Sequence, residues 1–290
     1  MITDIGSIKD SDSGALLKMW KATVPPGKRP LFRHSHIMFE ITYVVSGSGA
    51  YTVGNTVYSI TSGEIFVFSS NEQHCITAVG ENGLEIINLH FEPRYLWGRR
   101  YDSLTDRNFN FCFSHSPDFS NCIPAESAGE ISELFGKIKS ELSNKEPEYA
   151  LLVKSYLNSI IVKLIRDFGY SADTAELSRD RLKSVRRTIQ YIDTHLSEHF
   201  TLSSLSEIAG MSPNYYSSLF HSVSGITLWD YINSRRIESA IRLLSEEKGR
   251  TVLDIATMCG YNNTANFNKA FKKITGLTPS EYRLSGESIY

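Results

Sequence analysis

The chain contains 290 residues, which is enough for two domains that each bury a sizeable core. Its composition, 41% hydrophobic and 21% charged, is typical of globular proteins and excludes a disordered or fibrous chain. No apolar run approaches the ~18 residues of a membrane span, and the N-terminus lacks the order of a signal peptide. We therefore expect a cytoplasmic protein without a membrane contact. The four cysteines show neither a CxxC pair nor zinc spacing, so we expect reduced thiols.

The net charge of −2 hides an asymmetry along the chain. Between Arg179 and Leu284 there are fourteen Lys/Arg and ten Asp/Glu, whereas residues 1–178 carry sixteen and twenty-one. The C-terminal part is therefore the basic one, where a polyanion such as nucleic acid would bind. The excess is too small to identify a nucleic-acid binder by charge alone.

Residues 30–92 alternate apolar and polar side chains in short runs that are separated by turns rich in Gly and Asn. One turn is predicted at the glycine-rich stretch 47–49, and a two-residue hairpin turn is predicted at Gly54-Asn55. Closely spaced strands of this kind predict a small antiparallel barrel or sandwich.

In residues 127–168 the hydrophobic period becomes that of a helix, which predicts two helices on either side of residues 144–147. The second, at 148–168, carries an apolar stripe that is wider than packing on its own domain requires. We expect a homodimer through a pair of these helices, with Leu157 and Leu164 in the interface. The alternative is a helix that only caps the barrel.

A polar stretch at 169–182 is predicted to be an interdomain linker. The helical region that follows contains a degenerate repeat. Residues 205–210 align with 255–260 at an offset of fifty, and Phe220 aligns with Phe271 at fifty-one. Each copy predicts a helix, a short turn and a second helix, the order of a helix-turn-helix unit.

A helix-turn-helix unit places the start of its second helix in the major groove, where polar side chains read base edges and flanking cations meet phosphates. In the first copy the outward polar residues are Asn214, Tyr215, Ser217, Ser218 and His221. In the second copy they are Thr264, Asn266, Asn268, Lys269, Lys272 and Lys273. A long helix between the copies, at 227–244, offers Arg235 and Arg236 to the DNA backbone or to an acidic partner. This long helix would keep the second helices of the two copies at a fixed separation. That separation would suit two successive major-groove segments, which lie roughly 34 Å apart.

The C-terminal motifs resemble those of a known family. The segment SRRI at 234–237, and the pattern G-Y-x-N, F-x-K-A-F-K-K and G-x-T-P-x-x-Y-R at 260–283, are similar to the double helix-turn-helix domain of AraC/XylS transcriptional regulators. The resemblance implies a regulator that binds a double-stranded DNA operator under the control of a small-molecule effector, and it leaves a contact with RNA polymerase open. Ser206 stands where alanine is usual, and Ser217 and Ser218 are short. We therefore expect the second copy to carry more of the specificity.

The pattern His34-x-His36-x-x-x-Glu40 with a later His74 resembles the motifs of a cupin barrel, a sensor fold commonly joined to this DNA-binding domain. In metal-binding cupins these four residues would be the ligands. The second motif departs from the pattern, since serine and asparagine replace its usual proline and glycine. We expect a polar pocket that binds a small molecule, such as a sugar or sugar derivative, and no metal or cofactor. The alternatives are a bound metal and residues that only serve the structure of the barrel. The predicted effector-binding residues are His34, His36, Glu40, His74, Asn88 and His90.

The expected fold class is α+β multidomain, with an N-terminal antiparallel, cupin-like β-barrel, a helical dimerisation segment and a C-terminal all-α double helix-turn-helix. The expected boundaries are 1–126, 127–168, 169–182 and 183–285. We expect a transcriptional regulator and not an enzyme. Two alternatives stay open: a metal-dependent cupin enzyme fused to a DNA-binding domain, and a ligand-independent DNA-binding repressor. The sequence names neither the effector nor the operator.

Overall fold

The protein divides into two compact units. Its computed structural model describes residues 1–10, 14–27, 34–92, 95, 115–170, 179–224, 226–247 and 249–285. The first unit comprises Met1–Leu31 and Met38–Thr174, and the second comprises Phe32–Ile37 and Ala175–Tyr290. Most of the predicted linker, residues 171–178, lies outside the described residues.

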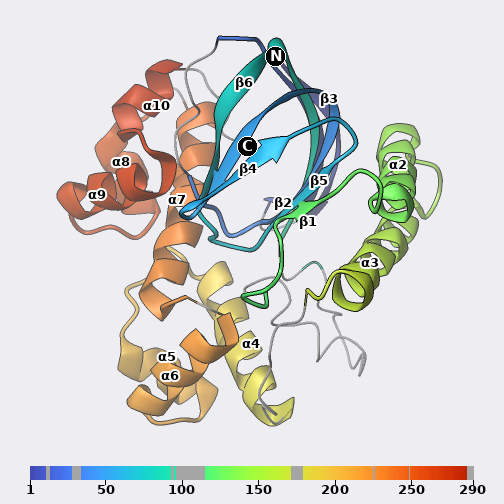
Figure 1. The fold of residues 1–290 in the computed structure, drawn as a ribbon. Helices are drawn as coiled ribbons and strands as arrows, with labels where there is room; N and C mark the ends of the chain where they lie inside the picture. Colours follow the sequence, from blue (N-terminus) through green and yellow to red (C-terminus); the bar gives the residue numbers. More distant parts are fainter. Residues whose placement is uncertain are drawn as a thin grey trace. The chain divides into compact units, whose positions relative to one another are not determined.

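The first unit is built on one seven-stranded sheet whose strand pairs are all antiparallel (Figure 1). The strands are β1 (Ile2–Asp10), β2 (Gly14–Val24), β3 (Phe39–Val53), β4 (Thr56–Ile60), β5 (Ile65–Phe68), β6 (His74–Phe91) and β7 (Cys122–Ile123). Their order is β1-β2-β6-β3-β5-β7, and β4 pairs with β3. In the described residues the two end strands are not paired with each other, so the sheet is cupin-like without being a closed barrel.

The predicted hairpin turn at Gly54-Asn55 is confirmed, because Val53 pairs directly with Thr56 and Gly54 has a φ of 56°. The predicted turn at 47–49 is wrong. There β3 continues with register irregularities and pairs with β6 on both sides of this stretch.

The glycines of the 47–49 stretch serve a close backbone approach instead of a chain reversal. A Cβ atom on Gly47 would lie 2.1 Å from the carbonyl oxygen of Gly83, and one on Gly49 would lie 2.4 Å from that of Ala78. Gly47 also has a φ of 93°, which side chains rarely adopt. A sequence pattern typical of a turn therefore marks the place where the backbones of two paired strands approach closely.

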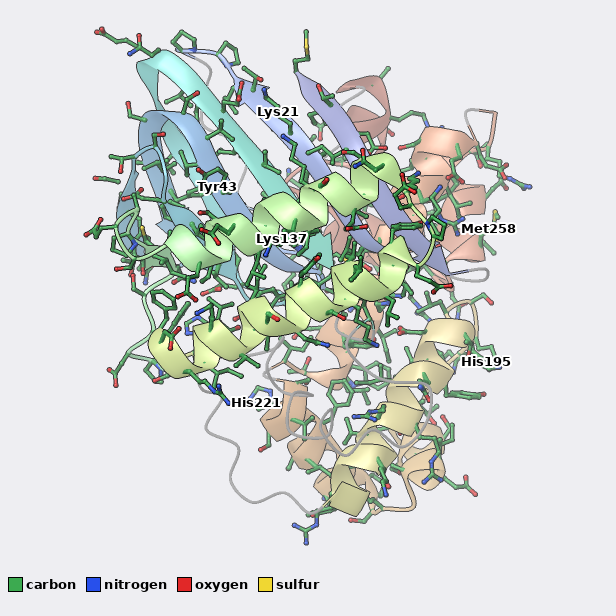
Figure 2. The ribbon with its side chains drawn as sticks, turned by 90° about the vertical axis from the view of Figure 1, so that its right-hand side faces the viewer. Lys21, Tyr43, Lys137, His195, His221 and Met258 are labelled. Atoms are coloured by element: carbon green, nitrogen blue, oxygen red, sulfur yellow. The ribbon has the colours of Figure 1, made fainter. Side chains whose placement is uncertain are left out.

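The two faces of the sheet have different neighbours. Helices α2 (Gly129–Asn144) and α3 (Tyr149–Asp167) lie across one face, as Figure 2 shows. The Tyr43 ring, labelled there, lies 6.1 Å from that of Phe135 on α2. Alternation along β3 places Ile41 on this helix-covered face and Glu40 on the opposite, inner face.

Helix α3 packs against α2 and buries most of its apolar stripe within the first unit. Leu157 and Leu164 have no exposed surface, so their predicted place in a dimer interface is wrong: they belong to the core of their own unit. The apolar side chains that α3 does expose are different ones: Leu151, Leu152, Val162 and Ile165.

The second unit is helical, as predicted. Its helices are α4 (Arg179–Thr194), α5 (Leu202–Ala209), α6 (Pro213–Ser224), α7 (Leu228–Glu246), α8 (Val252–Met258), α9 (Thr264–Thr275) and α10 (Pro279–Ser285). The repeat is visible in single hydrogen bonds. The hydroxyl of Ser224 donates to the carbonyl of Phe220 at 2.7 Å, and the hydroxyl of Thr275, fifty-one residues later, donates to that of Phe271 at 2.9 Å.

Two general properties complete the description. None of the helices in the described ranges combines the length and apolar character that a membrane span needs. Cys75, Cys122 and Cys259 are free thiols, and Cys112 lies outside the described residues.

Candidate functional site

Helices α5 and α6 form the first helix-turn-helix unit, and α8 and α9 form the second. Thr201 and Thr251 cap the first helix of each unit by accepting a hydrogen bond from the backbone N–H three residues later, at 3.0 and 3.1 Å. Both turns contain a left-handed glycine, Gly210 with a φ of 69° and Gly260 with a φ of 81°. The two copies therefore reach the same local geometry through equivalent residues.

The predicted DNA-facing residues of α6 and α9 lie opposite the buried sides of these helices. The buried sides consist of Tyr216, Leu219, Phe220 and Val223 on α6 and Phe267, Phe271 and Ile274 on α9. The exposed residues are Asn214, Tyr215, Ser218, His221, Asn266, Asn268, Lys269, Lys272 and Lys273. Ser217 and Thr264 are half-buried. Each second helix thus presents a polar outer face that begins in its first turn.

The two outer faces differ in charge. Helix α6 contains neither lysine nor arginine, whereas α9 contains three lysines. The Lys273 amine binds the Asp230 carboxylate at 2.9 Å, and this hydrogen bond lowers the pKa of Asp230 below its ordinary value. Part of the charge of Lys273 is therefore balanced within the unit, and Lys269 and Lys272 supply the positive charge of the second outer face.

Arg235 does not face solvent, and its predicted role at the DNA backbone is wrong. It is 6% exposed, and its Nε donates to Asp193 Oδ1 at 2.8 Å while its Nη1 donates to Glu238 Oε2 at 2.6 Å. The Tyr231 hydroxyl donates to the same Asp193 oxygen at 3.0 Å. The guanidinium is surrounded by carboxylates of its own unit and ties α7 to α4.

Arg236 is half-buried and also makes contacts inside the second unit. Its Nε donates to the carbonyl of Leu196 at 3.0 Å, and its Nη2 donates to that of Glu198 at 2.6 Å. The guanidinium lies 5.6 Å from the ring centroid of Phe200 and 5.5 Å from that of Tyr261, and burial lowers the pKa of Arg236. It fastens α7 to the segment that follows α4.

The sequence argument missed one exposed cation beside α6. The guanidinium of Arg181, near the start of α4, lies 5.5 Å from the ring centroid of Tyr215. The concentration of basic residues in RDRLKSVRR, at 179–187, was the available signal.

A buried polar cluster lies on the inner face of the first unit. Glu40 Oε2 lies 3.1 Å from His74 Nε2 and 2.8 Å from His90 Nε2. The Thr42 hydroxyl lies 2.7 Å from Glu40 Oε1 and 2.9 Å from Asn88 Oδ1. The structure thus brings together Glu40, His74, Asn88 and His90, four of the six predicted pocket residues, in this unit.

The Glu40 carboxylate and the His74 imidazole interact directly inside this cluster. Burial acts to lower the pKa of His74, but the negative charge of Glu40 and the hydrogen bond to it raise that pKa above its ordinary value. The two side chains therefore stabilise each other in a buried place.

Strand β2, which the sequence pattern did not predict, adds Trp20 and Lys18 beside the cluster. The Trp20 ring meets the His90 ring edge-on at 4.3 Å, and Lys18 Nζ lies 5.1 Å from the Trp20 ring centroid. Register places Lys18 opposite His90 and Trp20 opposite Asn88. On the other side the Phe68 ring stacks on His74 at 4.1 Å. The polar cluster is therefore bordered by aromatic rings.

The other two predicted pocket residues, His34 and His36, lie in the segment 34–37, which belongs to the second unit. Their rings are 5.7 Å apart. Within the second unit the backbone N–H of Ile37 donates to Glu238 Oε1 at 3.1 Å. The same glutamate that binds Arg235 thus also holds this segment.

The two departures from the cupin motif have structural partners. The hydroxyl oxygen of Ser69 lies 2.8 Å from that of Tyr170, and Asn71 adopts a φ of 64° in the turn between β5 and β6. The Glu72 carboxylate accepts from the Ser69 N–H at 2.9 Å and binds His115 at 3.1 Å. Burial acts to raise the pKa of Glu72, but these hydrogen bonds lower it below its ordinary value. This turn is therefore built around polar contacts that the motif's proline and glycine would not make.

Two family models match the chain. An AraC-like ligand-binding domain matches residues 28–161, and a helix-turn-helix domain matches residues 205–285. Among curated proteins, the probable transcriptional regulator LumQ of Photobacterium leiognathi is 22% identical over 86% of this chain and 91% of its own length. The transcriptional activator RhaR of Escherichia coli K12 is 24% identical over 86% of both chains.

Solved structures show the same fold. ToxT from Vibrio cholerae with a bound unsaturated fatty acid matches with a TM-score of 0.63 at 16% identity, over 95% of this chain and 97% of ToxT. Both the ligand-binding and the helix-turn-helix model match, and the related regulators align over most of the chain. The chain therefore belongs to the AraC family of transcriptional regulators, with an effector-binding domain and a helix-turn-helix DNA-binding domain.

Proposed function

We propose that the second unit reads its operator mainly through α9, and that the polar cluster of the first unit binds the effector. The observation that supports the first part is the exposed outer face of α9, where Asn266, Asn268 and Lys269 stand in the first two turns. Side chains of this kind pair with base edges in the major groove. Helix α6 presents shorter and uncharged side chains and contributes less to base discrimination.

A regulator of this kind acts where its DNA is, which in a bacterial cell is the cytoplasm. We assign it no enzymatic activity, because the related proteins are transcriptional regulators. A contact with RNA polymerase stays a prediction.

Replacing Lys269 or Asn266 by alanine is expected to cost about 1–3 kcal/mol of binding free energy and to relax preference at one operator position. Replacing Lys272 is expected to weaken all sequences alike and to reduce the salt slope by about one, because its charge meets phosphate. The measurement is a titration, at several salt concentrations, of a duplex selected by the protein from a random pool and of its scrambled version. Lys273→Ala serves as a comparison within the same helix. We expect it to change the salt slope less than Lys272→Ala does, because Asp230 already balances the charge of Lys273.

Equal losses on the selected and scrambled duplexes for the Lys269 and Asn266 variants would contradict base reading by α9. Base reading would then have to come from α6.

For the effector we propose a small, hydrogen-bonding molecule, with a sugar or sugar derivative as the first class to test. Hydroxyl groups suit a site that offers a carboxylate, an amide and imidazoles beside the Trp20 ring. The fatty acid in the ToxT structure makes carboxylic acids the second class.

A thermal-shift screen of sugars and fatty acids is expected to find a stabilising ligand, and Glu40→Gln is expected to reduce its affinity about tenfold or more. The reason is that a hydrogen bond to a charged group contributes about 1.5–3 kcal/mol. Glu81→Gln, at an exposed position of β6, removes the same charge elsewhere and serves as the control. If Glu40→Gln leaves the ligand-induced thermal shift unchanged, the polar cluster is not part of the ligand site.

Other outcomes of that experiment would favour the alternatives. No stabilisation by any sugar or fatty acid would favour a ligand-independent repressor. A stoichiometric metal ion in the purified protein that is lost in a His36→Ala variant would favour the metal-dependent cupin enzyme.

We also propose a homodimer through the outer face of α3. A shallow groove of about 400 Å³ on this face is lined by Asn158, Ser159, Val162, Lys163, Arg166 and Asp167. Val162 is 39% exposed and Ile165 is 37% exposed beside side chains of both charges. A two-fold axis would bring this patch against its own copy, where opposite charges meet.

Val162→Glu is expected to convert the dimer into a folded monomer with weaker operator binding, because it buries an unpaired charge at the interface. Sedimentation equilibrium measures the oligomer, and Ser140→Glu on the exposed side of α2 is the matched control. If the Val162 variant sediments like the wild type, the dimer does not use this face.

A further inference from the structure

We infer that Arg181 on α4 is a phosphate-binding residue of the first helix-turn-helix unit, and that the Tyr215 ring positions it. This inference rests on the proposed insertion of α6 into DNA. It assigns to α4, which is not part of the helix-turn-helix motif, a direct share in binding.

The need for such a residue follows from the composition of α6. A helix in the major groove lies between two phosphate backbones, and cations and backbone amides at its edges hold it in register. Helix α9 carries its own lysines, but α6 carries neither lysine nor arginine. The positive charge of the first helix-turn-helix unit therefore has to come from an element beside α6.

The geometry places Arg181 where that charge is needed. Helix α4 packs against α6 within the second unit. The Arg181 guanidinium lies 5.5 Å from the ring centroid of Tyr215, in the first turn of α6. Tyr215 is 41% exposed, and Arg181 is exposed as well. The cation thus stands beside the end of α6 that enters the groove.

The chemistry of the pair leaves the guanidinium available to an anion. An arginine stacked on an aromatic ring keeps its full charge, and the N–H groups at the edge of its plane still point outward. Arg235 differs, because Asp193 and Glu238 balance its charge.

Helix α4 also offers a matched control. Arg187 is exposed on the same helix, six residues after Arg181. At about 100° per residue it is rotated roughly 240° around the helix axis. Removing it subtracts the same charge from the same helix at a different place.

The experiment uses the full chain and a duplex of scrambled sequence, because a phosphate contact does not depend on sequence. Binding is measured by fluorescence anisotropy at several salt concentrations. We expect Arg181→Ala to weaken binding and to make the slope of log K against log salt less steep by about one unit. Tyr215→Ala is expected to act in the same direction, whereas Tyr215→Phe keeps the ring and the slope. Arg187→Ala is expected to leave the slope unchanged.

A wild-type slope for Arg181→Ala, or an equal loss for Arg187→Ala, would overturn the inference. Circular dichroism of each variant checks that α4 is intact, and Arg181→Lys supplies a variant that keeps the charge. If Lys272→Ala lowers the slope and Arg181→Ala does not, only this inference fails. If neither variant changes the slope of a protein that binds DNA, the proposed placement of the second unit on DNA fails with it.

Discussion

The DNA-binding unit depends on a buried guanidinium. Two helix-turn-helix units that read one DNA face need a constant separation, because successive major-groove segments lie roughly 34 Å apart. Helix α7 connects the two helix-turn-helix units. Its residue Arg235 binds Asp193 on α4 and Glu238 in the next turn of α7. Buried charges are expensive unless they are paired, so this arrangement tolerates little displacement. Arg235 is therefore buried within the second unit and does not face DNA. Its ion pairs stabilise the spacing between α6 and α9.

The first unit also contains a buried charged group with polar partners, the carboxylate of Glu40. Glu40 is buried with His74 and His90 against one of its oxygens, between aromatic rings and next to an amide. A buried carboxylate is tolerated there because hydrogen-bonding groups surround it. We propose that the first unit uses this cluster to bind its effector, whereas the second unit uses its buried ion pair for rigidity.

Local and periodic features were predictable from the sequence, but the neighbours of each side chain were not. The repeat and the Gly54-Asn55 turn depend on residues close in sequence, and the structure contains both. The register of β3 against β6, the burial of Leu157 and the carboxylates around Arg235 are set by distant segments. Strands β1 and β2 were missed, and with them Trp20 and Lys18 beside the polar cluster.

The central claim is that Arg235 holds the DNA-binding unit together and does not touch DNA. The most direct test is urea unfolding of the full chain with Arg235→Gln, followed by the far-ultraviolet circular dichroism of its helices. Removing one partner leaves the buried Asp193 carboxylate uncompensated, so the unit should lose about 3–5 kcal/mol of stability. Wild-type stability together with a salt slope of DNA binding reduced by about one would contradict the account, because it would place this arginine on a phosphate.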